Sequence, residues 1–226
     1  MKWKNYLLKQ IQNFFRIINF IFSNGINEKN FIHQNIKSGA VIFDIGSNVG
    51  SFINFISKNR KKTKLDIHAF EPNEKVINLS KNAIKSSLHN IYLVNAAVSS
   101  ANTKNIFFES SVSSQSSLKK ENINLGNIVS TNLVNVLTLD SYCEKNKIEY
   151  IDFLKIDVEG MEADVLRSAK YMLENKKIKI IKIESNQENT MKVFKILNDH
   201  QYELIGILNQ KYFKNSLKLC DFYFKC

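Results

Sequence analysis

Short apolar runs alternate with helical patterns along most of the chain from Ala40 onward. The runs "AVIFDI", "KLDIHAFEP" and "NIYLVNAAV" are separated by "VGSFINFISKN" and "EKVINLSKNAIKSS", and the same rhythm returns in "YIDFLKIDVEG", "MEADVLRSAKYMLEN" and "IKIIKIES". Repetition of strand and helix predicts parallel βαβ units with right-handed crossovers. This pattern restricts the chain to an α/β fold with a mostly parallel sheet.

Two regions break the rhythm. In the middle, "NIFFES" and "NLVNVLTLD" flank the serine-rich stretch "SSVSSQSSL" and predict an added strand pair rather than another βα unit. At the end, the helical segment "ENTMKVFKILNDH" leads to "YELIGIL" and "CDFYFKC", which predict a closing antiparallel hairpin. A chain of 226 residues has room for one such domain with an appended element.

The first 24 residues space their apolar side chains by three or four positions, which predicts an amphipathic helix. The opposite side carries Lys2, Lys9 and Arg16, and no acidic residue precedes Glu28. This helix could pack on the main domain or lie on an anionic membrane surface, and packing is favoured. We therefore divide the chain into a helical extension, residues 1–38, and a main domain, residues 39–226.

Composition bears on the compartment and the partners. No apolar run approaches the roughly 18 residues of a membrane span, and the N-terminus lacks the cleavage site of a signal peptide. The three cysteines show no CxxC spacing, so they predict neither a disulfide framework nor a zinc site. We expect a cytoplasmic protein, free or peripheral to the inner face of the membrane. The net charge of +11 would attract phosphate or anionic lipid, yet a nucleic-acid partner is not favoured, and the oligomeric state stays open.

The stretch "FDIGSNVGSF" follows the first predicted strand, where the ligands of doubly wound sheets approach the backbone. Gly46 and Gly50 allow a sharp turn without Cβ clashes, and Ser47 or Asn48 is expected to cap the helix that follows. This turn is a candidate ligand site.

Two acidic residues accompany the turn. Asp44 would carry its charge to the strand tip, where a cationic ligand group could meet it. Glu71, in "FEP" after the second strand, is placed to accept two hydrogen bonds from a ribose diol. The window "GSNVGS" lacks the second and third glycines of the dinucleotide fingerprint, and no P-loop occurs. The turn therefore indicates a nucleoside without a pyrophosphate, foremost S-adenosylmethionine; a purely structural turn is the alternative.

A second signature, "LKIDVEGME", begins as a buried strand and ends in acids around Gly160. If extended geometry persists, Asp157 and Glu159 face the same side of the strand tip. Together with "FDIGSNVG", "FEP", "SSL" and "VLTLDSYC", this signature resembles the FkbM family of S-adenosylmethionine-dependent methyltransferases, from about Val41 to Glu184.

The resemblance implies the Rossmann-like class I methyltransferase fold over residues 39–226. That fold has a mostly parallel seven-stranded sheet with an antiparallel C-terminal strand. It also implies methyl transfer to an oxygen, typically a hydroxyl of a sugar, glycan or secondary metabolite. Carried over to this chain, it assigns cofactor binding to Asp44, Gly46, Asn48, Gly50, Glu71, Asn95 and Ala96, the last two near the adenine.

The strand-tip acids are the candidate catalytic residues. A protonated hydroxyl is a poor nucleophile, so a general base or a metal that lowers its pKa should assist transfer. Asp157 and Glu159 are the best candidates for the base, followed by Glu184. The same carboxylates could hold Mg²⁺, and Glu159 could instead lie at the N-terminus of the following helix. The four histidines are expected to serve packing or the surface.

Three alternatives stay open. The serine-rich stretch is either a lid over the acceptor or a flexible connection. The lid is favoured because the stretch contains the "SSL" motif of the family. The enzyme could methylate RNA ribose, as the net charge and the run "NRKKTK" suggest. A non-catalytic protein that docks on a membrane or a partner is the third reading, but the retained glycines and acids argue against it.

Overall fold

The computed structural model describes residues 28–83, 88–112, 115–123, 126–213 and 216–226. The amphipathic helix expected before residue 25 lies outside these ranges, so its packing or membrane role stays a prediction. No helix in the described ranges has the length and hydropathy needed to cross a membrane.

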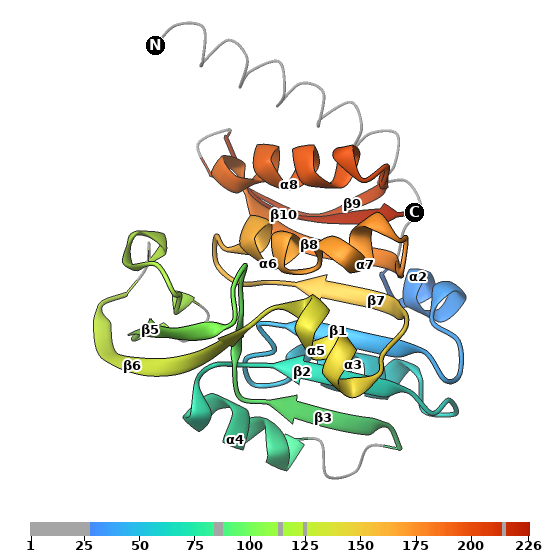
Figure 1. The fold of residues 1–226 in the computed structure, drawn as a ribbon, viewed down its shortest axis with the longest axis horizontal. Coiled ribbons are helices and arrows are strands. Elements are labelled where there is room, and N and C mark those ends of the chain that lie inside the picture. Colours follow the sequence, from blue (N-terminus) through green and yellow to red (C-terminus); the bar gives the residue numbers. More distant parts are fainter. Residues whose placement is uncertain (1–27, 84–87, 113–114, 124–125, 214–215) are drawn as a thin grey trace, which may run out of the picture.

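The core is a seven-stranded sheet with the order β3-β2-β1-β7-β8-β10-β9 (Figure 1). Its strands are β1 (Val41–Ile45), β2 (Asp66–Phe70), β3 (Asn90–Val94), β7 (Ile151–Ile156), β8 (Ile178–Asn186), β9 (Glu203–Phe213) and β10 (Ser216–Lys225). The first five in the spatial order are parallel, and β10 runs antiparallel to β8 and β9. The predicted mostly parallel sheet and closing hairpin are confirmed.

Both faces of this sheet are covered. The helices are α2 (Glu28–Asn35), α3 (Ser51–Asn59), α4 (Glu74–Ala83), α5 (Leu139–Asn146), α6 (Glu162–Ser168), α7 (Lys170–Glu174) and α8 (Gln187–Asp199). Ile42 and Phe153 pack with α2 and α3 on one face, whereas Phe43 and Leu154 pack with α5 to α8 on the other. Burial on both sides explains why these strands are almost continuously apolar.

The helical pattern "MEADVLRSAKYMLEN" forms two helices rather than one. Ala169 separates α6 from α7 with φ −109° and ψ 28°, outside the helical region. Its side chain is fully buried in the core beside the sheet, so the break occurs where the chain packs most tightly.

A second, three-stranded sheet forms the expected excursion, with the order β4-β6-β5. Its strands are β4 (Ala97–Val98), β5 (Thr103–Ser110) and β6 (Ile128–Leu137), and the 3-10 turn η2 (Lys120–Asn122) lies in the β5–β6 connection. β5 and β6 pair antiparallel, which confirms the added strand pair. Phe107, Val134 and Val136 form a small core with Ala97. Figure 1 shows this sheet beside the carboxyl ends of the central strands.

Candidate active site

The turn after β1 requires glycine at position 46. Gly46 has φ +77°, and a Cβ there would lie 1.9 Å from the backbone oxygen of Asp157. The amides of Gly46 and Ser47 both donate to the carbonyl of Phe70 at 3.0 Å. This close approach joins the turn after β1 to the segment after β7, so the two sequence signatures meet at one place.

The capping prediction for the same turn is wrong. Helix α3 begins at Ser51 with Gly50 as its N-cap, and no side chain caps it. Gly50 adopts a left-handed conformation with φ +79°, and Asn48 does so with φ +46°. The backbone of the turn therefore carries Ser47 and Asn48 away from the capping position.

Glu71 follows β2 and is buried against the turn. Its Oε2 accepts a hydrogen bond from the amide of Asn48 at 3.0 Å, and its Oε1 accepts one from the amide of Asn73 at 2.9 Å. Burial raises the pKa of Glu71 to about 7, against the lowering effect of these two hydrogen bonds. In its ionised form, Glu71 is a buried carboxylate that can only accept hydrogen bonds.

Asp44 is paired with a cation of the protein itself. It lies within β1, fully buried, and its Oδ1 accepts a hydrogen bond from Nζ of Lys155 at 3.0 Å. The cation that faces Asp44 is therefore a lysine of the neighbouring strand β7. Desolvation raises the pKa of Asp44, and the charge of Lys155 opposes that shift.

A pocket of about 270 Å³ opens at the carboxyl ends of these strands. Seven predicted site residues line it: Gly46, Asn48, Glu71, Ala96, Asp157, Glu159 and Glu184. Asp44, Gly50 and Asn95 do not line it. Asn95 contacts the backbone of a lining residue instead: its Nδ2 donates to the carbonyls of Glu71 and Pro72 at 3.0 Å. The pocket therefore joins the predicted cofactor residues to the predicted catalytic acids.

The acids after β7 reach the pocket through a turn rather than an extended strand. β7 ends at Ile156, Glu159 has φ +49° and Gly160 has φ +89°. The expectation that Asp157 and Glu159 share one side by strand alternation is therefore wrong. They line the same pocket because the left-handed residues reverse the chain. Glu184 reaches it from β8.

Glu159 has the environment of a proton-transfer group. Burial, together with the charges of Asp157, Glu184 and Glu162, raises its pKa to about 8. A hydrogen bond from Nε2 of Gln115 to its Oε2, at 2.9 Å, acts in the opposite direction. Near neutral pH this carboxyl is therefore mostly protonated, and a minor fraction is ionised.

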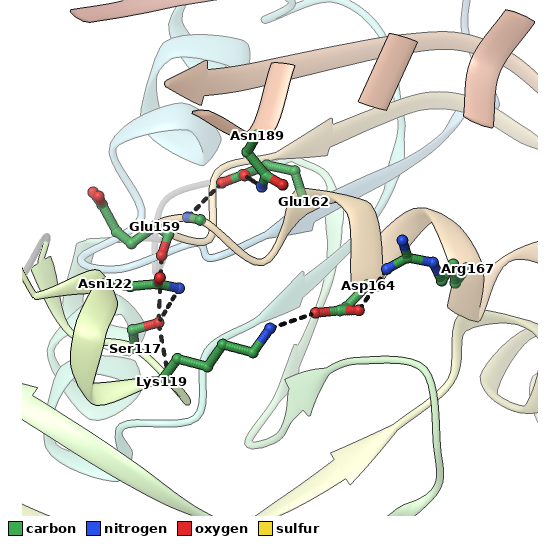
Figure 2. Close-up of polar contacts among 9 residues, drawn as sticks. Ser117, Lys119, Asn122, Glu159, Glu162, Asp164, Arg167 and Asn189 are labelled. Carbon is green, nitrogen blue, oxygen red and sulfur yellow. Dashed lines mark hydrogen bonds and ion pairs between the residues drawn. The ribbon is translucent and has the colours of Figure 1, made fainter. Parts of the chain in front are cut away.

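The connection between β5 and β6 closes against this turn, and Figure 2 shows the contacts. Oγ of Ser117 donates to the backbone oxygen of Glu159 at 3.3 Å, and Lys119 pairs with Asp164 of α6 at 3.2 Å. A Cβ at Gly160 would lie 2.8 Å from Nδ2 of Asn122. Gln115, Ser116, Ser117 and Leu118 line the pocket. The "SSL" motif was the sequence signal for this part of the pocket lining. The sequence analysis did not identify Gln115 as a site residue.

The helix-terminus role weighed for Glu159 belongs to Glu162. Oε1 of Glu162 accepts a hydrogen bond from the amide of Gly160 at 2.8 Å, and its other carboxylate oxygen is hydrogen-bonded by the side chain of Asn189 (Figure 2). Glu162 is buried at the start of α6. The side chain of Glu159 lines the pocket instead.

The described residues were expected to hold a cofactor and, as a weaker expectation, Mg²⁺. In the ranges that the structure describes, no three His, Cys, Asp or Glu side chains are arranged to hold a metal ion, so the Mg²⁺ expectation gains no support. The cofactor side fits S-adenosylmethionine better. Oδ1 of Asn48 is a buried acceptor without a protein partner, and it lies in the pocket with Glu71. Ribose hydroxyls and an ammonium group are the donors that such acceptors need.

Comparison with solved structures supports the same fold. An FkbM methyltransferase from Methylobacillus flagellatus KT superposes with a TM-score of 0.55 at 14% identity, over 84% of this chain and 44% of that one. This chain thus spans less than half the length of that protein. An rRNA methylase from Streptococcus thermophilus gives 0.53 at 11% identity, over 88% of this chain and 93% of that one. A Streptococcus mutans protein in complex with SAH gives 0.51 at 12% identity, over 88% and 96%.

At these identities the superpositions establish the fold alone. No curated protein sequence matches the chain. The sequence profile of the methyltransferase FkbM domain, however, matches residues 44–204, which include the turn after β1, Glu71 and the acids after β7. The chain therefore belongs to the FkbM methyltransferase family and has the class I methyltransferase fold.

Proposed function

We propose that the enzyme is an O-methyltransferase that acts on a hydroxyl of a sugar, glycan or secondary metabolite. The observation that carries the proposal is the position of Glu159. Its carboxyl has a pKa near 8 and shares one pocket with Gly46, Asn48 and Glu71. A general base is most effective when its pKa lies close to the working pH. Glu159 meets this condition at the place where an acceptor must enter.

The cofactor half of the pocket is assigned to the turn after β1 and to Glu71. Bound S-adenosylmethionine supplies a methyl group that is already activated by a sulfonium. Glu71 would accept the hydrogen bonds of the ribose diol, and the open acceptor on Asn48 would take a donor of the same ligand. Ala96 borders the place assigned to the adenine. Asp44, Gly50 and Asn95 support these residues from outside the pocket.

The acceptor half is assigned to the three acids. Methyl transfer would form a bond to the acceptor oxygen as the bond between the methyl group and the sulfonium sulfur breaks, which leaves a neutral thioether. Glu159 would take up the hydroxyl proton on a carboxylate oxygen. Asp157 and Glu184 accept hydrogen bonds from neighbouring hydroxyls and so fix the acceptor in line with the methyl group. An ionised carboxylate accepts hydrogen bonds and donates none. Several carboxylates in one pocket therefore suit a polyol, which offers several donors.

The charge of the pocket bears on the RNA alternative. Four carboxylates line it, those of Glu71, Asp157, Glu159 and Glu184, and no lysine or arginine is among its described lining residues. A phosphate backbone close to this wall would be repelled. The rRNA methylase neighbour shares the fold, and its substrate does not transfer to this chain at 11% identity.

The test is methyl transfer from labelled S-adenosylmethionine to three matched acceptor sets: neutral hydroxylated sugars, hydroxylated non-sugar metabolites and ribosomal RNA. We expect label in one of the first two sets, and Glu159→Gln should remove most of it. Label only in RNA, weakened steeply by salt, would replace the proposal with the RNA reading. Loss of transfer on chelation would reassign the carboxylates as metal ligands.

A further inference from the structure

Lys155 is a buried lysine that contacts two carboxylates on different strands. Its Nζ lies 3.0 Å from Oδ1 of Asp44 and 3.3 Å from Oδ2 of Asp157. Asp44 is fully buried within β1, whereas the side chain of Asp157 is 30% exposed and lines the pocket. Lys155 therefore links the interior of the sheet to one acid of the active site.

Strand geometry explains the arrangement. Asp44 and Lys155 are direct partners in the parallel pairing of β1 and β7. Lys155 and Asp157 are two residues apart, and Asp157 directly follows β7, so their side chains leave the same face. The amide of Asp157 also donates to the carbonyl of Ile45 at 3.0 Å. Asp157 is thus held through its backbone by β1 and through its side chain by Lys155.

The neighbouring strand provides a natural comparison. Lys182 of β8 is the register partner of Lys155, and it is also buried between two carboxylates, Glu28 at 2.6 Å and Asp221 at 3.1 Å. Both ammonium groups lie over the ring of Phe52, at 5.7 and 6.0 Å from its centroid. The two lysines differ in one respect: neither carboxylate partner of Lys182 lines the pocket.

We propose that Lys155 is a positioning residue for methyl transfer, which fixes the direction of the Asp157 carboxylate at the acceptor side of the pocket. The inference rests on the proposed role of Asp157 toward the acceptor. The ammonium lies within ion-pair distance of both carboxylates, and its burial reduces the screening of these pairs by salt. Asp157 therefore meets the acceptor already oriented.

The electrostatic consequence reaches Glu159. The charge of Asp157 is one of the causes that raise the pKa of Glu159 to about 8. Because Lys155 fixes the direction of the Asp157 carboxylate, it also fixes where this charge lies relative to Glu159. Two carboxyls in different environments can divide the orienting and proton-accepting roles.

The test is a double-mutant cycle on turnover with Lys155→Met, Asp157→Asn and their combination, with Lys182→Met as the matched control. We expect Lys155→Met to lower kcat by about tenfold or more, while the KM for S-adenosylmethionine changes only a few-fold. In the Asp157→Asn background the same change should have almost no further effect on kcat, because its target is gone. Lys182→Met should reduce stability and leave kcat near that of the parent.

Additive effects of Lys155→Met and Asp157→Asn would overturn the proposal, and so would equal losses of kcat for Lys155→Met and Lys182→Met. If Lys155→Met does not fold, the double variant Asp44→Asn, Lys155→Met takes its place in the cycle. This variant removes one buried charge of each sign. The cycle uses whichever acceptor the parent methylates. Methyl transfer to RNA alone would contradict the proposed function. The mutant cycle would still test the coupling of Lys155 to Asp157, with RNA as the acceptor.

Discussion

Glu71 is a carboxyl whose protonation and ligand binding must be linked. A ribose diol binds the ionised carboxylate, and in the free protein the pKa of Glu71 is raised to about 7. The affinity for S-adenosylmethionine should therefore increase from pH 6 to pH 8, with release of a proton on binding. Calorimetry in buffers of different ionisation enthalpy measures both effects.

A substitution at the same position gives the size of the contact. Glu71→Ala should weaken cofactor binding by about 1.5 to 3 kcal/mol, the range for hydrogen bonds to a charged group, and should flatten its pH dependence. The control is Glu74→Ala, at an exposed glutamate in the first turn of α4. Equal affinity in the Glu71 variant and the parent would contradict the ribose assignment.

Glu159 sets the pH dependence of turnover. A base acts in its ionised form, so kcat should increase with pH up to about pH 8, the value to which burial and neighbouring acids raise the pKa of Glu159. Glu159→Gln should lower kcat by about 10²- to 10⁴-fold and remove this limb, with cofactor affinity nearly unchanged. A pH profile of the variant that still rises toward pH 8 would assign the limb to another group.

At the scale of elements, the β5–β6 connection should act on chemistry through Gln115. Its hydrogen bond favours the ionised form of Glu159. Gln115→Ala should therefore move the rising limb of the kcat profile to higher pH and raise the KM of the acceptor several-fold, with little effect on cofactor affinity. The control is Lys104→Ala, an exposed position on β5 of the same excursion. Identical pH profiles for the parent and Gln115→Ala would show that the contact has no part in turnover.

The elements also show what sequence can and cannot give. The turn at Gly46, the acid at Glu71 and the segment at Asp157 were predictable because strand ends carry local signals, and parallel strands bring their ends together. The left-handed residue at Glu159 was not, since the turn is held partly by a tertiary contact, the hydrogen bond from Ser117 to the backbone oxygen of Glu159. The pairing of Asp44 with Lys155 depends on register between strands 111 residues apart, which no local pattern contains.

For the whole molecule, the raised carboxyl pKa values have a consequence for stability. Glu71 and Glu159 bind protons more tightly when folded than when unfolded, so between about pH 5 and pH 8 the folded state binds more protons. Stability must then fall as the pH rises through this window. His68 acts in the opposite direction below about pH 6, because burial lowers its pKa to about 4.

The contribution of the two carboxyls is isolated by comparing the parent with the Glu71→Gln, Glu159→Gln variant. Between pH 5.5 and pH 7.5 the variant should gain about 4 kcal/mol in free energy of unfolding relative to the parent. Denaturant unfolding at the two pH values, without cofactor, measures this difference. Parallel pH dependence in both proteins would mean that these groups titrate alike in the folded and unfolded chains.

The three-stranded sheet has a small core of its own, and the β5–β6 connection supplies part of the pocket lining. The segment from residue 99 to residue 137 can therefore vary in evolution as a cassette, while the Rossmann-like platform that holds the methyl donor stays the same. A chimera that receives this cassette from another FkbM enzyme should inherit the donor's acceptor preference and retain the recipient's affinity for S-adenosylmethionine.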